Sequence, residues 1–311
     1  MKRLRIWLYA ISALLICSCA ACGKQNPESG AKQEEKQDET KPAPTQTEFT
    51  LSIMSFNIAV DNRQEDKGWD WRRDAVVKML KQERPLVIGL QEAQAHEITY
   101  LVKHGPSYVR YGLGRDTGKA PKLQDDYDAE ETMLIMWDPA ALDATEKGTF
   151  WLSETPDKPG KGWDADYNRN VNWVRFYHKG TGLSFYYFNT HLDNKGSVAR
   201  TESMKLIAER IKSINKENLP VFLSADFNAK SNNAIFAPIR DWMKSARNEA
   251  PESESVKNTF NGYNAPKSQI DHIFFCGDKV SAQTFRVLDG DYGATWISDH
   301  YPIVATFNYK K

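Results

Sequence analysis

Apolar stretches separated by polar ones run along the chain from about residue 49 onward, and their spacing predicts strands and helices. The expected strands, judged by alternation or by continuous apolar character, lie at 49–60, 85–92, 133–137, 173–178, 183–191, 220–226, 269–275 and from 302 onward. Apolar positions at helical spacing predict helices over 69–82 and 197–214. The polar stretches 112–126 and 153–168 are expected to be loops. Strand segments outnumber helices, and no internal repeat is present.

Six of the apolar stretches border a carboxylate, an amide or an imidazole. The bordering residues are Asn57, Gln91–Glu92, Asn189–His191, Asp226–Asn228, Asp271–His272 and Asp299–His300. One such border could arise by chance, whereas six indicate strands that converge on one rim and build a polar site above an apolar core. For the last pair alone, a surface turn with a solvated acid is the alternative.

The first 22 residues have the pattern of an export signal. Three basic residues precede the apolar stretch 6–16, which is too short to span a bilayer permanently. Cysteines crowd its end, and the segment resembles the signals of bacterial lipoproteins, so Cys19, with Cys22 as second choice, is expected to carry lipid. Ordinary secretion with cleavage near Ala21 is the alternative. Lipidation would anchor an extracytoplasmic protein of the cell envelope to its membrane without spanning it.

Residues 23–48 are mostly Lys, Glu, Gln, Pro and Thr, a composition that predicts a disordered tether. The remainder, 49–311, has the size of one large domain. Basic and acidic residues number 41 each over the chain, and the domain alone stays near neutral. Tight binding of nucleic acid through charge is therefore not indicated, and nucleic acid is expected only as a substrate.

Cys276 is the one cysteine of the 49–311 domain. With a single cysteine, this domain can form neither an internal disulfide nor a cysteine-rich metal site. We expect Cys276 to be a small buried hydrophobe.

Carboxylate and amide oxygens at the expected rim suit Mg²⁺ or Mn²⁺. Glu92 is the best single ligand candidate, because an acid that closes a buried strand needs a compensating charge. A structural salt bridge is its alternative. Zinc is less favoured, since the sequence has no HxxxH or HxH pair.

The remaining residues of the rim suit chemistry on a phosphate. A histidine paired with an aspartate can act as a base at neutral pH. Amides and imidazoles can surround an oxyanion, and the candidates are Asn57, Asn189, Asn228 and His191. There is no GxSxG nucleophile motif and no glycine-rich phosphate loop, so attack by water at phosphorus is favoured over a covalent intermediate.

The ordered motifs SFNI, IGLQE, NTHLD, SADFNA, IDHIFF and SDHYPI resemble those of the endonuclease/exonuclease/phosphatase superfamily, which includes deoxyribonuclease I. The resemblance spans essentially residues 49–307. It implies an α+β fold, a four-layer α/β/β/α sandwich of two packed mixed β-sheets flanked by helices, with the site at one edge. The segments NTHLDNKGSVAR and FWLSETPDKPGKGWDADYNRNVNW are more similar to an exported bacterial branch than to repair nucleases.

The resemblance implies roles for the rim residues. Glu92 would be the principal metal ligand, with Asn57 and Asp299 serving the metal. His191 would contact the scissile phosphate as acid or electrophile, while Asp226 and Asn228 would orient water and bind phosphate oxygens. His300, oriented by Asp271, would be the base or a phosphate ligand. Asn189 and Arg169 would contact substrate.

Several further positions stay open at this point. A surface or core-capping role for Arg169 is the alternative to phosphate contact, and the same applies to Arg200. Asn194 stands where the exported branch usually has histidine. Trp163 and Tyr167 could stack on a substrate or cap the core, whereas Trp296 is expected in the core.

The sequence thus predicts a lipid-anchored, monomeric, metal-dependent phosphoesterase that uses Mg²⁺ or Mn²⁺ outside the cytoplasm. Its substrate, a phosphodiester or phosphomonoester, stays open between nucleic acid, phospholipid head groups, and sugar or inositol phosphates. The alternative is a surface lipoprotein that binds a ligand or partner without catalysis, because one scaffold supports many functions.

Overall fold

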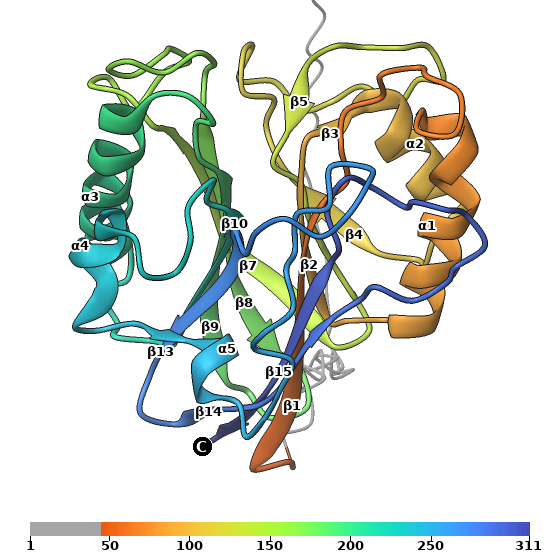
Figure 1. Ribbon diagram of the computed structural model, residues 1–311. Coiled ribbons are helices and arrows are strands. Elements are labelled where there is room, and N and C mark those ends of the chain that lie inside the picture. Colours follow the sequence, from red (N-terminus) through yellow and green to blue (C-terminus); the bar gives the residue numbers. More distant parts are fainter. Residues whose placement is uncertain (1–44) are drawn as a thin grey trace, which may run out of the picture. The chain divides into compact units, whose positions relative to one another are not determined.

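The structure is a computed structural model that describes residues 45–311 (Figure 1). The predicted signal at 1–22, the lipidation candidates Cys19 and Cys22, and nearly all of the predicted tether lie outside the described residues. The first strand, β1 (Glu48–Asn57), is preceded by backbone that already belongs to the fold. The Gln46 N–H donates to Gly180 O at 3.2 Å, and Lys311 N–H donates to Thr47 O at 2.8 Å. The folded region therefore begins slightly before the predicted boundary at residue 49.

Within residues 45–311, the strands form two large mixed sheets and one small ribbon. The seven-stranded sheet has the order β12 (Glu252–Ser253), β14 (Val280–Val287), β15 (Ile303–Lys310), β1, β2 (Val87–Gln91), β6 (Ile135–Trp137), β4 (Val109–Tyr111). The six-stranded sheet has the order β11 (Lys244–Ser245), β13 (Asp271–Cys276), β10 (Val221–Asp226), β9 (Ser184–His191), β8 (Asn170–His178), β7 (Leu142–Trp151). Strands β3 (Ala93–Gln94) and β5 (Glu131–Thr132) form the ribbon. The central pairs β1–β2 and β9–β10 are parallel, whereas β15 and β13 flank them in antiparallel orientation.

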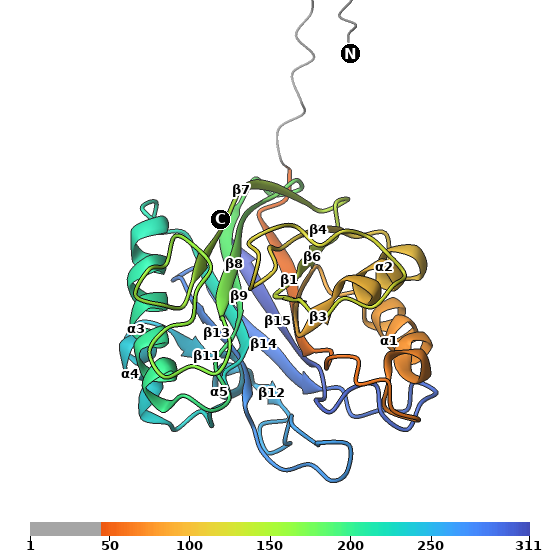
Figure 2. The same cartoon turned by 90° about the horizontal axis from the view of Figure 1, so that it is seen from above.

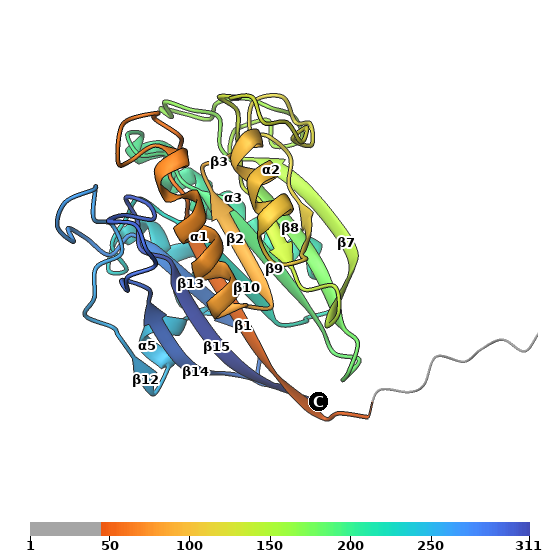
Figure 3. The same ribbon diagram turned by 90° about the vertical axis from the view of Figure 1, so that its right-hand side faces the viewer.

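The two large sheets pack face to face, and helices cover both outer faces (Figures 1 and 2). Residues of β1, β2, β15, β9, β10 and β13 that point between the sheets form one buried apolar cluster. Helices α1 (Trp69–Glu83) and α2 (Ala95–His104) lie over the seven-stranded sheet, as Figure 3 shows face-on, and bury its other side in a second cluster. Helix α3 (Ser197–Ile214), the short turn η1 (Ala234–Phe236) and α4 (Ala237–Arg240) cover the six-stranded sheet. The predicted four-layer α/β/β/α sandwich is confirmed.

Gly89, in the middle of β2, lets the two sheets approach closely. A Cβ atom at this position would stand 2.2 Å from Tyr187 Oη and 2.7 Å from Asn189 Oδ1. Both partners belong to β9 in the opposite sheet and are fully buried. A side chain at residue 89 would therefore push the sheets apart directly beneath the strand ends.

The predicted segments correspond closely to the observed elements. The helix predicted over 197–214 has the observed bounds, and the one predicted over 69–82 extends to Glu83. Sequence reasoning missed β7, β14 and α2. It also missed the short elements β3, β4, β5, β11, β12, η1, α4 and α5 (Ala246–Glu249). Two expectations about burial were wrong: Cys276 is only half-buried, and Trp296 is half-buried and outside the three core clusters. No helix among residues 45–311 is long and apolar enough to cross a membrane.

Candidate active site

Polar side chains from both sheets meet at one edge of the sandwich, arranged in columns that each take one residue from either sheet. The first column joins His300, just before β15, to Asp271 at the start of β13. The second joins Asn57 at the end of β1 to Asp226 at the end of β10. The third joins Glu92, just after β2, to His191 at the end of β9. Because β13 and β15 are antiparallel to the central strands, their first residues lie at the edge where the parallel strands end.

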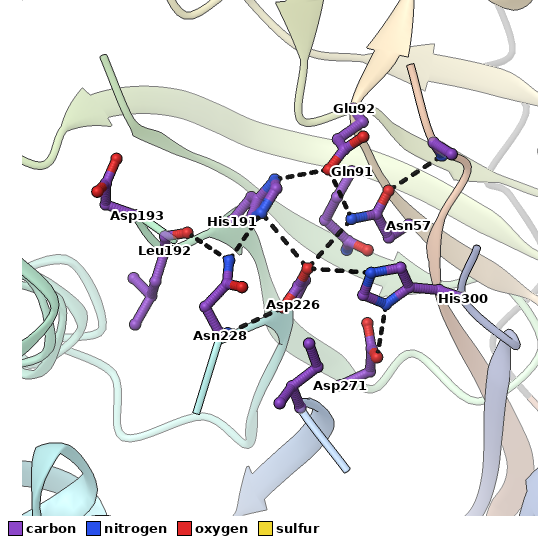
Figure 4. Close-up of polar contacts among 12 residues, drawn as sticks. Asn57, Gln91, Glu92, His191, Leu192, Asp193, Asp226, Asn228, Asp271 and His300 are labelled. Carbon is purple, nitrogen blue, oxygen red and sulfur yellow. Dashed lines mark hydrogen bonds and ion pairs between the residues drawn. The ribbon is translucent and has the colours of Figure 1, made fainter. Parts of the chain in front are cut away.

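A continuous chain of polar contacts links the three columns (Figure 4). Asp271 Oδ2 lies 2.9 Å from His300 Nδ1, and His300 Nε2 lies 3.6 Å from Asp226 Oδ2. The Asn57 amide then donates to Asp226 Oδ2 at 3.1 Å and to Glu92 Oε1 at 2.9 Å. The six predicted strand borders thus deliver their charged and amide groups to one connected site.

Glu92 is held in an unusual backbone conformation. Its φ of 61° lies in the left-handed region, which costs a non-glycine residue on the order of 1–3 kcal/mol. Its carboxylate accepts hydrogen bonds from the Asn57 amide and, at 2.9 Å, from the Val60 N–H. The side chain keeps 21% of its surface exposed, toward the pocket. These contacts fix one carboxylate with open coordination capacity at the mouth of the site.

A buried arginine holds the loop that follows β1. Arg72 is 0% exposed and donates from Nε to Lys67 O at 2.8 Å and from Nη2 to Ala59 O at 2.6 Å. Its Nη1 donates to Ile58 O. Glu97, also 0% exposed, accepts from Nη2 at 3.3 Å and compensates the buried charge. The loop that supplies the Val60 N–H to Glu92 is therefore fixed from beneath.

Asn57, predicted to sit beside the metal and help hold it, contacts the two carboxylates and does not offer its own oxygen to the pocket. Its Oδ1 accepts from the Ala59 N–H at 3.0 Å, and its Nδ2 is directed at the two carboxylates. The side chain is completely buried and does not line the pocket. Asn57 positions Glu92 and Asp226 instead.

The donor set nevertheless fits a divalent cation. Asp299 is half-buried and lines the same pocket as Glu92, and its carboxylate has only a long contact, 3.4 Å, with Ser298 Oγ. Burial, followed by the charge of nearby Glu92, raises the pKa of Asp299 against the opposing effect of His300. A cation held by Glu92 and Asp299 would offset the negative charge that is costly at Asp299. Asp226, Asp271 and His300 form a further cluster with ligand atoms within 4.8 Å of one another, but these groups already contact each other.

Asn228 and His191 form the opposite wall. The Asn228 amide donates to Leu192 O at 3.0 Å and lies 3.1 Å from His191 Nε2, and its N–H donates to Asp226 Oδ1 at 2.8 Å. His191 Nδ1 has no hydrogen-bond partner among the described residues and lies 3.9 Å from Glu92 Oε1. Burial, reinforced by Arg169 and Arg115, lowers the pKa of His191 well below its usual value. This shift favours the neutral imidazole. The Asn228 amide directed at Nε2 favours the tautomer with the proton on Nδ1, whereas the Asp226 carboxylate, 3.4 Å from Nε2, favours the other one.

The pKa values of Asp226 and His300 are shifted upward, in contrast to that of His191. Burial raises the pKa of Asp226 to about 7, although His300 acts in the opposite direction. Burial alone would lower the pKa of His300, but the carboxylates of Asp271 and Asp226 outweigh it and raise the value to about 10. These shifts favour a neutral His191 beside a protonated His300, with Asp226 able to exchange a proton near neutral pH.

Two predicted substrate contacts have different outcomes. Asn189 is fully buried beneath the pocket, where it accepts from Gln91 Nε2 at 2.7 Å and donates to Leu90 O at 2.8 Å and Leu134 O at 3.1 Å. Its predicted contact with substrate is wrong, because its hydrogen bonds tie the two sheets together. Arg169 is 5% exposed and lines the pocket, so it is neither a surface residue nor a core cap. Arg200 donates to Asp193 O at 2.8 Å and does not line the pocket.

The pocket has a volume of about 360 Å³. Its walls comprise Val60, Glu92, Arg115, Glu131, Tyr167, Arg169, His191, Asn194, Asp226, Asn228, Phe260, Ile270, Asp299 and His300. Sequence reasoning missed Arg115 and Glu131, whose side chains form an ion pair at 2.6 Å. Arg115 lies in a stretch treated as a loop, and nothing in the sequence marks it. Glu131 lies two residues before the apolar stretch that begins at Met133. An acid next to a predicted strand was therefore present in the sequence here too.

The chain belongs to the Endonuclease/Exonuclease/phosphatase family, whose model matches residues 54–300. Members of this family are phosphoesterases and nucleases and typically depend on a divalent metal. The predicted family is thereby confirmed.

Solved structures agree with this assignment. A family member from Bacteroides thetaiotaomicron is 30% identical with a TM-score of 0.77, over 85% of this chain and 99% of that one. A mannosyl-6-phosphatase of the same organism is 31% identical with a TM-score of 0.76, over 83% and 99%. The human Nocturnin catalytic domain, at 14% identity and a TM-score of 0.66 over 84% and 95%, shares the fold.

Curated relatives match over shorter stretches. An uncharacterized protein, L388, of Acanthamoeba polyphaga mimivirus is 26% identical over 171 residues, which is 51% of this chain and 59% of that protein. A Pescadillo homolog of Leishmania braziliensis is 28% identical over 35% of this chain and 14% of its own length. The matches thus span less than two thirds of these relatives.

Proposed function

We propose that this protein is a divalent-metal-dependent phosphoesterase that hydrolyses a phosphodiester or phosphomonoester by attack of water at phosphorus. The observation that carries the proposal is the contact chain from Asp271 through His300, Asp226 and Asn57 to Glu92. It places a carboxylate that can accept a proton, a cationic imidazole and a partly exposed carboxylate around one pocket. A non-catalytic binding protein would not need such a connected set.

The chain's own groups divide the reaction among them. Glu92 and Asp299 would hold the cation, which when bound supplies Lewis-acid stabilisation of negative charge on phosphate oxygens. Asp226 is placed to accept a proton from the attacking water, and its pKa of about 7 suits a general base. The N–H groups of protonated His300 and, in its Nδ1 tautomer, of His191 are donors for the charge that develops on the phosphate.

The site of action is also part of the proposal. The basic and apolar pattern of residues 1–22 supports export and lipid attachment through Cys19 or Cys22, so the enzyme would act as a monomer tethered at the cell envelope. Mass spectrometry of the N-terminal peptide from cells carrying Cys19→Ser or Cys22→Ser tests this part. Unmodified, freely released protein from the unaltered gene would contradict it.

The natural substrate is proposed only as a class. One relative is a mannosyl-6-phosphatase, which supports sugar phosphates as candidates beside nucleic acid, phospholipid head groups and inositol phosphates. Hydrolysis of such a panel by the purified protein in Mg²⁺ and in Mn²⁺ is the test, with EDTA and His300→Ala as controls. We expect activity that EDTA abolishes and either metal restores. Full activity in a Glu92→Ala, His300→Ala double variant would refute the proposal.

A further inference from the structure

A fourth column continues the row of polar residues beyond Glu92 and His191. On the six-stranded sheet, Arg169 immediately precedes β8, whose residue Val171 pairs with Thr190 beside His191. On the other side, Glu131 of β5 pairs with Gln94, two residues after Glu92, and binds Arg115. This arginine subsite, defined as Arg115, Glu131, Tyr167 and Arg169, lies at the end of the pocket opposite to His300.

The subsite holds buried guanidinium N–H groups that the described residues do not use as hydrogen-bond donors. Arg169 is 5% exposed, and its Nε and Nη1 have no hydrogen-bond partner among residues 45–311. Its nearest acid is Asp193, 3.5 Å from Nε. Arg115 is 6% exposed, and its Nη1 binds Glu131. Its Nε lies 3.8 Å from the Asp116 carboxylate and has no hydrogen-bond partner in the described chain. Buried guanidinium groups with unused donors favour an anionic partner.

The Tyr167 ring packs against the guanidinium groups of both arginines. Its ring centroid lies 4.8 Å from Arg115 Cζ and 5.4 Å from Arg169 Cζ, and its side chain is 47% exposed. The Glu131 carboxylate holds Arg115 from the side. The guanidinium groups are therefore fixed by protein contacts, and ordering them on binding costs little.

The two ester classes differ in what they would present to this subsite. A phosphate diester carries one negative charge, and a second alcohol substituent occupies one of its phosphorus positions. A monoester has a terminal oxygen at that position and carries up to two charges. An alkyl or sugar substituent against Arg115 and Arg169 would cover their donors without pairing them, whereas a terminal oxygen would accept their hydrogen bonds.

We propose that the arginine subsite selects phosphate monoesters over diesters by binding terminal phosphate oxygens with Arg169 and Arg115. This inference rests on the proposed phosphoesterase activity and narrows its substrate class. Arg169 is the principal donor, and Arg115, held by Glu131, is the second.

The test compares kcat/KM for p-nitrophenyl phosphate and bis-p-nitrophenyl phosphate in the full-length protein with Mg²⁺ or Mn²⁺. The variants are Arg169→Gln and Arg115→Lys, the latter chosen because it keeps a cation beside buried Glu131. Arg210→Gln on α3 is the matched control, because Arg210 pairs with exposed Asp157 outside the pocket. Circular dichroism and the melting temperature verify folding.

The unaltered protein should prefer the monoester. Arg169→Gln should lower kcat/KM for the monoester by roughly ten- to a hundredfold, the loss expected for a hydrogen bond to a charged group, and change the diester value by less than about threefold. Arg115→Lys should act in the same direction, and Arg210→Gln should change neither. Preference for the diester, or parallel losses on both esters, would overturn the inference and leave the phosphoesterase proposal standing.

A binding measurement separates the two proposals if neither ester is hydrolysed. Calorimetric titration with inorganic phosphate and with dimethyl phosphate, in the same metal, measures the subsite without turnover. Weakening of phosphate binding by at least about tenfold in Arg169→Gln, with dimethyl phosphate unaffected, would support the subsite even though the proposed catalysis had failed. Equal effects on both anions, or none, would refute it.

Discussion

The contact between Asp271 and His300 gives a quantitative prediction. Asp271→Asn keeps the shape of the side chain but removes its charge. Asp271 Oδ2 and His300 Nδ1 are 2.9 Å apart, and both side chains are at least 95% buried. The Asn oxygen can still accept from Nδ1, so the variant should lose the charged part of this hydrogen bond while packing stays the same.

The expected size follows from that contact. Hydrogen bonds to charged groups contribute about 1.5–3 kcal/mol, and each 1.36 kcal/mol corresponds to a factor of ten. The Asp271 carboxylate raises the pKa of His300 against the effect of burial, so its removal disfavours the imidazolium that would face the phosphate. A neutral hydrogen bond of about 0.5–1.5 kcal/mol remains in the variant, so the loss is about 1–1.5 kcal/mol. We expect kcat to fall roughly 5- to 13-fold with KM little changed.

The assay is steady-state hydrolysis at fixed metal concentration and pH 7, beside a Cys276→Ser control on the same strand but far from its pocket end. Thermal unfolding should show that both variants are folded. A folded Asp271→Asn variant with kcat within about threefold of the parent would refute the orienting role assigned to Asp271.

Three further predictions concern metal, packing and pH. Glu92→Gln should weaken Mn²⁺ binding by at least about tenfold in calorimetry, because one of the two open carboxylates loses its charge; unchanged affinity would remove Glu92 from the ligand set. Gly89→Ala should destabilise the fold by about 1–3 kcal/mol in urea titration, since the new methyl group would collide with Tyr187 and Asn189, whereas neutral stability would show that the sheets can separate freely. His272 is buried against Ala229 O, and burial lowers its pKa from 6.5 to about 4. Between these values the unfolded chain binds more protons, so stability should fall on acidification from pH 6.5 toward pH 4 by roughly 3 kcal/mol at most, and His272→Gln should flatten the slope between pH 5 and 6.5.

Elements with a strong apolar pattern could be predicted from the sequence. The buried strand ending at Gln91 and the helix over 197–214 are examples, because burial on both faces or on one helical stripe leaves a clear signature. Strand β7 was missed because it is an edge strand whose middle residues are exposed and polar. Strand β14 does alternate in burial, and α2 begins with a capping box formed by Gln94 and Glu97, so both left signals that could have been used.

The candidate site, too, could be predicted from the sequence only in part. Residues at strand ends could be brought together by reasoning, because parallel strands end at a common edge. The resemblance assigned Asn57 to the metal and Asn189 to the substrate. The sequence of a motif does not show in which direction an amide side chain points. Only the contacts to Ala59, Gln91 and Leu134 show that these amides hold the scaffold. Arg115 comes from a loop, where no periodic pattern constrains position.

The alternation of the columns between the two sheets ties the site to their alignment. Each site residue at the end of β1, β2 or β15 faces one at the end of β9, β10 or β13, so a slip of one sheet against the other would separate every pair at once. Such a slip could leave helices and strands intact. We therefore expect enzyme activity to report on the alignment of the two sheets. In mild denaturant, activity should disappear before the far-ultraviolet circular dichroism signal of the secondary structure changes.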